Sequence, residues 1–427
     1  MAPLNKPGNE ALLRALFEEA VASAQPDQTL AQHLPEPPVG RTVVVGVGKA
    51  AASMARTVED HWEGPLSGVV VVPEGATVPL QRIRTLIGSH PVPSDGSVRA
   101  GEELLSAVRG LTGDDLVIAL VSGGGSALCA YPAAGLTLEK KQGITRELLM
   151  RGASIAEINT VRRHLSGIKG GRLAVSAYPA KVITLLISDI PGDDAALIAS
   201  GPTLADPSSC EDAIAVLGRY GVELDHVAQS ALRAGTWESI KPGDQRLKRN
   251  RHVVVASAWN GLQAACQKAL SLGYVAHILS DAMEGESREL AKSLAAIALS
   301  VAQRGTPFRA PCILLSGGEA TVAVRGTGRG GRNTEFALAF ALAVKNRPGA
   351  TRIHALSAGT DGLDGNANAA GAWVDSTTLA QGAALGLSGQ QHLDNNDSAG
   401  LLGATGNLIH TGPTFTNIND FRAILVL

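Results

Sequence analysis

The stretch "RTVVVGVGKAAASMART", Arg41–Thr57, decides the fold class of this chain. Its valines form a continuous apolar run, which is typical of a strand buried on both faces of a parallel sheet. The run leads into a G-x-G-x-x-A pattern from Gly46 to Ala51, in which a strand turns tightly into a helix. The pattern by itself leaves three interpretations open: a dinucleotide site, the packing of a strand against a helix, or a site for another anion.

Two neighbouring features bear on this choice. A dinucleotide site calls for an acidic residue about 20 positions further on, at the end of the next strand. The nearest candidate, Glu74, lies 28 positions after Gly46 and does not fit. Lys49 places an ammonium group at the start of the helix, where a phosphate or a carboxylate would bind. The turn made by Gly46, Gly48 and Lys49 is therefore a candidate anion site.

Similar apolar runs recur along the chain and alternate with stretches of helical spacing. They predict two α/β halves, with mostly parallel sheets covered by helices on both faces. The polar segment 236–251 suggests a boundary, so we expect domains at 1–240 and 250–427. A surface helix is expected at residues 10–24. In the second half, "EATVAVRGTG" suggests an antiparallel excursion.

The composition narrows the class of protein. With 45% hydrophobic and 18% charged residues the chain is a globular protein, and its net charge of -2 with no basic run argues against a nucleic-acid partner. Four scattered cysteines indicate a reducing compartment. The N-terminus lacks the pattern of a signal peptide, and glycines with a proline interrupt the uncharged run 116–136. We expect a cytoplasmic protein without a membrane partner.

Glycine-rich and polar loops follow the strands of the first half. Ligands of open α/β sheets bind beyond the carboxyl ends of the strands, so each loop is a candidate site. The first of three loops fits either an anion nest or a tight turn that caps a helix. The second fits either a ligand contact or a solvated lysine. The third fits either a Mg²⁺ site or residues of a turn and a helix cap. The residues are Ser122, Gly123, Gly124, Gly125 and Ser126 in the first loop, Lys169 in the second, and Asp189 with Asp193 in the third.

The second half carries three further loops of this kind. "RGTGRGGRNTE", from Arg325, predicts a mobile basic loop that leads into a helix and suits a phosphoryl group, although a flexible hairpin tip would also explain it. The other two loops add glycines and carboxylates. The candidates are Gly317, Gly318 and Glu319 in one loop, Arg329 and Arg332 in the basic loop, and Asp361, Asp364 and Asn366 in the last.

Taken together, the loops describe a site for a polyanion. The chain contains no G-x-x-x-x-G-K-[ST] motif, no protein-kinase signature and no G-x-S-x-G motif. These absences argue against a P-loop enzyme, a protein kinase and a serine hydrolase.

Nine short blocks, in conserved order from Gly46 to the C-terminus, carry a resemblance to a known family. They include "GVGKAA", "SHPVPSDGS", "VSGGGSAL", "INTVRRHLSGIKGGRLA", "LISDIPGDD", "ASGPT", "SGGEATV", "GRGGRNTEFAL" and "ALSAGTDGLDGNANAAGAWVD". In these blocks the chain resembles the class II glycerate kinases, the glycerate 2-kinase family with a C-terminal MOFRL domain. The resemblance implies a Rossmann-like first domain, a mixed-sheet MOFRL-type second domain, and an active site in the cleft between them.

The resemblance also implies an activity: ATP-dependent, Mg²⁺-assisted phosphorylation of D-glycerate to 2-phosphoglycerate. In this family a lysine of the GxGK block and an arginine of the GRGGRN block are the proposed essential residues. These correspond here to Lys49 and to Arg332, with Arg329 as the second choice, while the metal ligands are not assigned. The sequence is compatible with a homodimer.

Two other functions remain as alternatives. Members of the family are also labelled hydroxypyruvate reductases, so an NAD(P)H-dependent reductase is the first. A sugar-phosphate-binding regulator is the second.

Overall fold

The computed structural model describes residues 8–427, which divide into two compact units. Unit 2 contains Pro26–Ser188 and Asp193–Val255. Unit 1 contains the described N-terminal residues up to Gln25, the short segment Asp189–Gly192 and Ala256–Leu427. The division differs from the predicted ranges 1–240 and 250–427 chiefly at the N-terminus, whose helix lies in unit 1.

Unit 2 is built on a six-stranded sheet with the order β3-β2-β1-β4-β5-β6. The pairings of β2 with β3, of β1 with β2 and β4, and of β4 with β5 are all parallel. Strands β1 and β4 are buried at every position, which explains their unbroken apolar sequence. This strand order is that of dinucleotide-binding folds, so the predicted Rossmann-like, mostly parallel sheet is confirmed. The strands are β1 (Thr42–Val47), β2 (Leu66–Val72), β3 (Ile83–Ile87), β4 (Leu116–Val121), β5 (Lys181–Ile187) and β6 (Arg251–Ala256).

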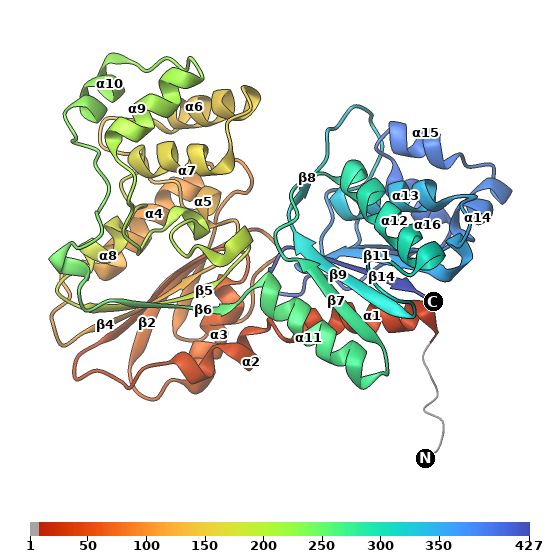
Figure 1. The fold of residues 1–427 in the computed structure, drawn as a ribbon. Helices are drawn as coiled ribbons and strands as arrows, with labels where there is room; N and C mark the ends of the chain where they lie inside the picture. Colours follow the sequence, from red (N-terminus) through yellow and green to blue (C-terminus); the bar gives the residue numbers. More distant parts are fainter. Residues whose placement is uncertain (1–7) are drawn as a thin grey trace. The chain divides into compact units, whose positions relative to one another are not determined.

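Helices cover this sheet on both faces. Figure 1 shows α3 on one face, with α4, α5 and α8 on the other. A further layer of helices, α6, α7, α9 and α10, packs around a separate apolar cluster that includes Leu148, Ile158 and Leu217. The helices are α2 (Pro26–Thr29), α3 (Ala51–His61), α4 (Asp95–Val108), α5 (Gly125–Leu128), α6 (Leu138–Met150), α7 (Ile155–His164), α8 (Arg172–Ser176), α9 (Cys210–Arg219) and α10 (His226–Arg233).

One strand lies in a different sheet from the one that its position suggests. The predicted boundary at residue 250 places the run "HVVVASAW" in the second domain, but β6 is the edge strand of the unit 2 sheet, beside β5. The side chain of Asn250, just before β6, accepts a 2.9 Å hydrogen bond from the backbone N–H of Val182 in β5. The last passage of the chain from unit 2 to unit 1 therefore falls at the end of β6 instead of before it.

Unit 1 is built on a mixed six-stranded sheet with the order β13-β12-β11-β14-β9-β7. Strands β7 and β9 are parallel, and the other neighbours are antiparallel, which confirms the predicted mixed sheet. The strands of this sheet are β7 (Val275–Ser280), β9 (Cys312–Gly318), β11 (Ile353–Gly359), β12 (Gly371–Val374), β13 (Leu408–Ile409) and β14 (Asp420–Val426).

The predicted antiparallel excursion after Glu319 is wrong. Strand β10 (Ala320–Thr321) pairs in parallel with β8 (Gly285–Glu286), and the pairing covers two residues on each side. Beyond β10 the chain does not fold back as a strand. Its amides at Arg325 and Gly326 instead donate to the side chain of Asn396.

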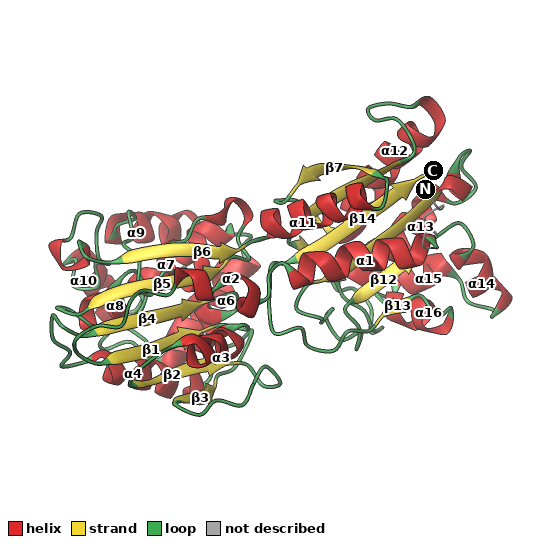
Figure 2. Cartoon of the chain, turned by 90° about the horizontal axis from the view of Figure 1, so that it is seen from below, coloured by secondary structure: helices red, strands yellow, loops and turns green. Residues whose placement is uncertain are grey.

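Helices also cover both faces of the unit 1 sheet. Figure 2 shows α1 and α11 on the near face and α13 behind the strands. The predicted surface helix is α1, and its apolar face packs into the core: Leu12, Leu13 and Leu16 are fully buried against α11 and the sheet. Each such side chain stabilises the fold by roughly 1.5–3 kcal/mol. The other face of α1 is open to solvent, with Ala11 and Glu18 exposed. The helices are α1 (Asn9–Ala22), α11 (Ala258–Ser271), α12 (Ser287–Arg304), α13 (Arg332–Val344), α14 (Thr378–Ala384), α15 (Gly389–Asp394) and α16 (Ser398–Ala404).

Across residues 8–427, no helix combines the length and the apolar character needed to cross a membrane.

Candidate active-site residues in each unit

The carboxyl ends of β1 and β4 bring two predicted loops together in unit 2. The strands are parallel neighbours, with Val47 opposite Val121. The turn after β1 and the glycine loop after β4 therefore leave the same edge of the sheet side by side. The backbone N–H of Lys49 donates a 2.9 Å hydrogen bond to the carbonyl of Gly123, which joins the two loops directly.

The backbone amides of the first turn already donate to protein acceptors. Gly48 donates to the carbonyl of Val71 at 3.1 Å, and Ala50 donates to the hydroxyl of Ser122 at 3.0 Å. Gly48 has a φ of +133° and lies against Ser122, where a Cβ atom would approach the hydroxyl to 2.2 Å. The glycines therefore serve close packing of the turn, and the group that this turn offers to an anion is the half-buried side chain of Lys49.

The glycine loop after β4 differs from this turn, because its backbone amides do not donate to protein groups of the described chain. Within the described chain, the four amides from Gly123 to Ser126 have no protein acceptor. Gly124 adopts the left-handed conformation, with a φ of +82°, at the start of α5. Successive unpaired amides in such a turn form a concave donor surface for an anion. Lys49 and His90 flank this surface, since a Cβ atom on Gly124 would lie 3.4 Å from Cγ of Lys49 and 3.2 Å from the ring of His90.

A chain of polar side chains continues from this nest. The hydroxyls of Ser126 and Ser200 are 2.7 Å apart, and Ser200 donates to the amide oxygen of Asn159 at 3.2 Å. Ser200 and Ala199 both have a positive φ, of 60° and 52°. Residues other than glycine held in this region cost about 1–3 kcal/mol each, and such strain often marks functional sites.

Lys169, predicted as a ligand contact in a glycine turn, is almost completely buried. Its ammonium group donates to the carbonyl of Cys129 at 2.7 Å. Burial lowers its pKa to about 8, with a smaller contribution from the positive charge of Arg162. A lysine beside two glycines reads as exposed in sequence, but Gly170 and Gly171 here pack against Ser239 and Ile240.

In unit 1 the predicted arginine, Arg332, is the first residue of α13. Its Nε donates to Asp420 at 2.8 Å and its Nη1 donates to Glu319 at 2.7 Å. Burial lowers the pKa of Arg332, but the charges of Asp420 and Glu319 outweigh it, so the pKa is raised above its usual range. Because a guanidinium group has five N–H donors, these two bonds leave others for a ligand. Asp420 was missed from the sequence because it is the first residue of a buried strand whose other residues are mostly apolar.

The basic loop before α13 is anchored, so the prediction of a mobile loop is wrong. The N–H groups of Thr327, Arg329 and Gly330 donate to the side chains of Asn395, Asp397 and Asn366. Its glycines allow this close approach: at Gly328 a Cβ atom would lie 2.3 Å from Asp397. The Arg329 side chain itself is exposed.

The N-terminus of α13 is also occupied by a protein group. The buried carboxylate of Asp364 accepts hydrogen bonds from the N–H groups of Asn333 and Thr334, both at 2.8 Å. Asp364, a metal candidate in the sequence, is therefore a helix cap. Gly317 and Gly318 are likewise buried in β9, where Gly318 packs against the backbone of Met283.

The predicted acidic residues after β5 separate in the structure. Asp189 belongs to unit 1, where the side chain of Asn419 donates to its carbonyl and Asn417 contacts its carboxylate at 3.4 Å. Asn419 also lies 3.5 Å from Nη2 of Arg332, so Asp189 and Arg332 are near neighbours. Asp193 belongs to unit 2. Asp361 is half-buried, and its charge adds to the raised pKa of Arg332.

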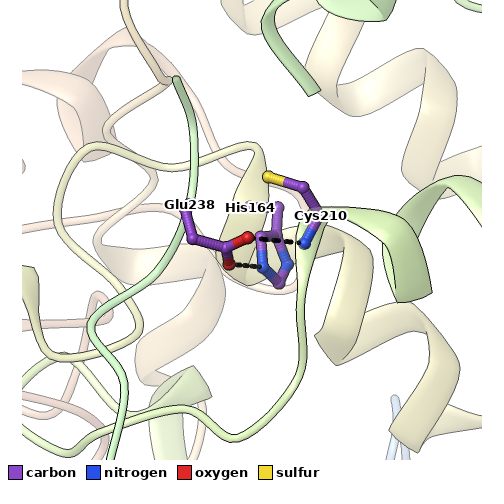
Figure 3. A group of neighbouring side chains, drawn as sticks. All are labelled: His164, Cys210 and Glu238. Carbon is purple, nitrogen blue, oxygen red and sulfur yellow. Dashed lines mark hydrogen bonds and ion pairs between the residues drawn. The ribbon is translucent and has the colours of Figure 1, made fainter. Parts of the chain in front are cut away.

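A search of the described residues for three converging metal ligands finds one group, which sequence reasoning did not single out: His164, Cys210 and Glu238 (Figure 3). Glu238 accepts from Nε2 of His164 at 3.0 Å and pairs with Lys241 at 2.5 Å. Burial and the charge of Glu238 raise the pKa of the Cys210 thiol to about 11. The group is thus a satisfied hydrogen-bond network with a neutral thiol, and it lacks the set of oxygen ligands that Mg²⁺ prefers.

Comparisons with known proteins cover nearly the whole chain. A family model described as a domain of unknown function, DUF4147, matches residues 12–234, and the MOFRL family model matches residues 312–420. A protein of Agrobacterium vitis, provisionally named a hydroxypyruvate reductase, is 48% identical and covers 97% of this chain and 94% of its own length. The D-glycerate 2-kinase of Thermotoga maritima is 38% identical, over 96% of this chain and 97% of its own. The crystal structure of a glycerate kinase from the same organism matches with a TM-score of 0.87 and 37% identity, over 98% of this chain and 99% of that one.

Proposed function

Because the chain belongs to the class II glycerate kinase family, we propose that it transfers the γ-phosphoryl group of ATP to the 2-hydroxyl of D-glycerate, giving 2-phosphoglycerate and ADP. The observation that supports this most directly is the nest beside Lys49, whose four amides have no protein acceptor in the described part of the chain. Fixed N–H donors next to an ammonium group are suited to a phosphoryl group.

The proposed roles follow from the chemistry of phosphoryl transfer. Catalysis of this reaction depends on aligning the acceptor hydroxyl and on neutralising the charge of the transferring group. Lys49, with the amides from Gly123 to Ser126, would hold phosphate oxygens in unit 2. Arg332, held by hydrogen bonds to Asp420 and Glu319, is the candidate for a second positive charge to act on the transferring group.

Mg²⁺ enters the proposal as a partner of the nucleotide. This ion usually keeps several waters and takes one or two carboxylates together with substrate phosphates, so it needs no three-carboxylate cluster. The half-buried Asp361 and Asp189 are the residues that would hold it, and bound Mg²⁺ would neutralise phosphate charge. Asp193 stays a candidate for orienting the acceptor hydroxyl. The cytoplasmic location and the homodimer also stay predictions.

The reductase alternative draws support from the strand order of unit 2 and from the name of the Agrobacterium relative. The first turn argues against it. A dinucleotide pyrophosphate binds the amides of this turn in Rossmann folds, but those of Gly48, Lys49 and Ala50 donate within the protein.

One pair of assays separates the two functions. With ATP, Mg²⁺ and D-glycerate, the purified protein should release ADP, and NMR should identify 2-phosphoglycerate. With NADH and hydroxypyruvate it should not oxidise NADH. Lys49→Met should lower kcat by at least about 100-fold with the fold intact, because the charge that it removes faces the phosphoryl group. Oxidation of NADH without formation of ADP would reverse the assignment.

A further inference from the structure

Three cationic side chains of unit 2 lie near one another: Lys141 of α6, Arg162 of α7 and Lys169. Lys169 bonds to Cys129, at the end of the short helix that begins at the glycine nest. Lys141 and Lys169 are almost completely buried, and Arg162 is partly exposed. Burial lowers the pKa of Lys141, and the charges of Lys169, Arg162 and Arg172 lower it further. The three groups are therefore close enough to repel one another.

None of the three pairs with a carboxylate within the described chain. Lys141 donates to the carbonyl of Leu165 at 2.5 Å, and Lys169 donates to that of Cys129. Within residues 8–427, the guanidinium of Arg162 has no protein hydrogen-bond acceptor. The next residue shows the contrast, because Arg163 pairs with the buried Asp206 at 3.1 Å. A group of cations so weakly compensated is stabilised by a bound anion.

The position of Arg162 links this group to the proposed active site. Asn159 and Arg162 are three residues apart on α7, so they share one face of the helix. Asn159 contacts Ser200, and Ser200 contacts Ser126 of the nest. Lys169 bonds to Cys129, which lies at the C-terminal end of α5, and the nest lies at the N-terminal end of the same short helix.

We propose that Arg162, backed by the fixed charges of Lys141 and Lys169, binds the carboxylate of the acceptor substrate. This inference rests on the proposed function and adds the residue that selects an α-hydroxy acid over a neutral polyol. The planar guanidinium fork matches a carboxylate with two parallel hydrogen bonds. The amide nest with Lys49 remains for the phosphoryl group. The hydroxyls of Ser126 and Ser200 connect the nest to Asn159, on the same helix as Arg162, and the acceptor hydroxyl would lie beside them.

Steady-state kinetics of Arg162→Met test the assignment. The KM for D-glycerate should rise by about 10- to 100-fold, because a charge-assisted bidentate contact is lost, while the KM for ATP should stay within about twofold. Arg162→Lys, which keeps the charge without the fork, should fall between. With glyceramide, which has no carboxylate, wild type and Arg162→Met should have equal kcat/KM. Arg146→Met, an exposed arginine on the neighbouring helix α6, is the matched control and should behave as wild type.

Three results would overturn the inference. In the first, Arg162→Met raises the KM for ATP and leaves the KM for glycerate unchanged, which would place a nucleotide phosphate at Arg162. In the second, neither KM changes, and in the third, Arg146→Met raises the KM for glycerate as much as Arg162→Met does. Calorimetric titration with sodium D-glycerate keeps this test separate from that of the proposed function. If the wild type forms no ADP, the kinase proposal fails, yet loss of glycerate binding in Arg162→Met alone would still support the subsite.

Discussion

Replacing Asp420 by asparagine tests how unit 1 holds its candidate arginine. Asp420 is completely buried at the start of β14. Its Oδ1 accepts from Arg332 and Asn333, and its Oδ2 accepts from Arg422 at 2.7 Å. Asparagine keeps the shape of the side chain but removes its charge and one acceptor. Both arginines lose a shared counter-charge.

The size of the effect depends on Arg422. This side chain is 1% exposed, stacks on Phe336 at 5.3 Å, and has one unpaired Nε. Among the ion pairs of the described chain, the carboxylate that pairs with Arg422 is that of Asp420. Breaking a buried pair by removing one member costs about 3–5 kcal/mol, because the other charge stays buried. We expect Asp420→Asn to lower the stability of unit 1 by that amount.

The assay must resolve the two units, because one unfolding midpoint does not describe a chain with two domains. Hydrogen exchange read by mass spectrometry on peptides from β14 and β9 reports unit 1, and peptides from β1 and β4 serve as the internal control. The double variant Asp420→Asn, Arg422→Met should recover part of the loss, since it removes the uncompensated charge. A loss below about 1 kcal/mol in the single variant, or no recovery in the double, would refute this account.

Three further predictions concern the remaining candidate groups. Arg332→Lys should lower kcat by about 100-fold with unit 1 folded, since one ammonium cannot bond Asp420 and Glu319 with the geometry of the guanidinium; a coupled ADP assay measures it. Ser122→Ala leaves the N–H of Ala50 without an acceptor and should cost unit 2 about 1–2 kcal/mol, read by hydrogen exchange on peptides from β1 and β4. The pKa of Lys169 is about 8 in the folded protein against 10.5 for an ordinary lysine, so protonation of Lys169 favours the unfolded state. The resulting loss of folding stability is absent above pH 10.5, grows as the pH falls, and is complete below about pH 8. Lys169→Met should therefore stabilise unit 2 relative to wild type by up to about 3 kcal/mol more at pH 7 than at pH 10.5, and an equal difference at both values would contradict the shift.

The buried parallel strands were predictable from the sequence because they contain unbroken apolar runs. Strand β3 was missed, since it is short and only partly buried, and with it the position of His90 at the glycine nest. The helix α1 was predicted at the surface because its spacing is amphipathic. Helical spacing shows that one face is apolar, but it does not show which domain covers that face.

More of the candidate site could be predicted from the sequence in unit 2 than in unit 1. In unit 2 the rule for parallel strand ends was enough to place Lys49 beside the loop of Gly123, because β1 and β4 are neighbours. In unit 1 the partner of Arg332 lies 88 positions further on, inside an antiparallel strand. No local pattern marks Asp420 as polar and functional, because it opens a run that otherwise resembles a core strand.

The glycine-rich loops show why sequence motifs of this kind need a test of their backbone donors. A glycine can serve the approach of a ligand or the approach of the protein's own chain, and the two uses look alike in sequence. In the loop before α13 and in the turn after β1, the amides donate to protein oxygens, and a Cβ atom at Gly48 or Gly328 would clash with a neighbouring residue. From Gly123 to Ser126 the amides have no protein acceptor among residues 8–427, and the left-handed turn at Gly124 faces Lys49 and His90 instead of a packed strand. Because buried or half-buried amides are seldom left without acceptors, this loop, and not the motif that first suggests a nucleotide, is the place where the phosphoryl group is expected to bind.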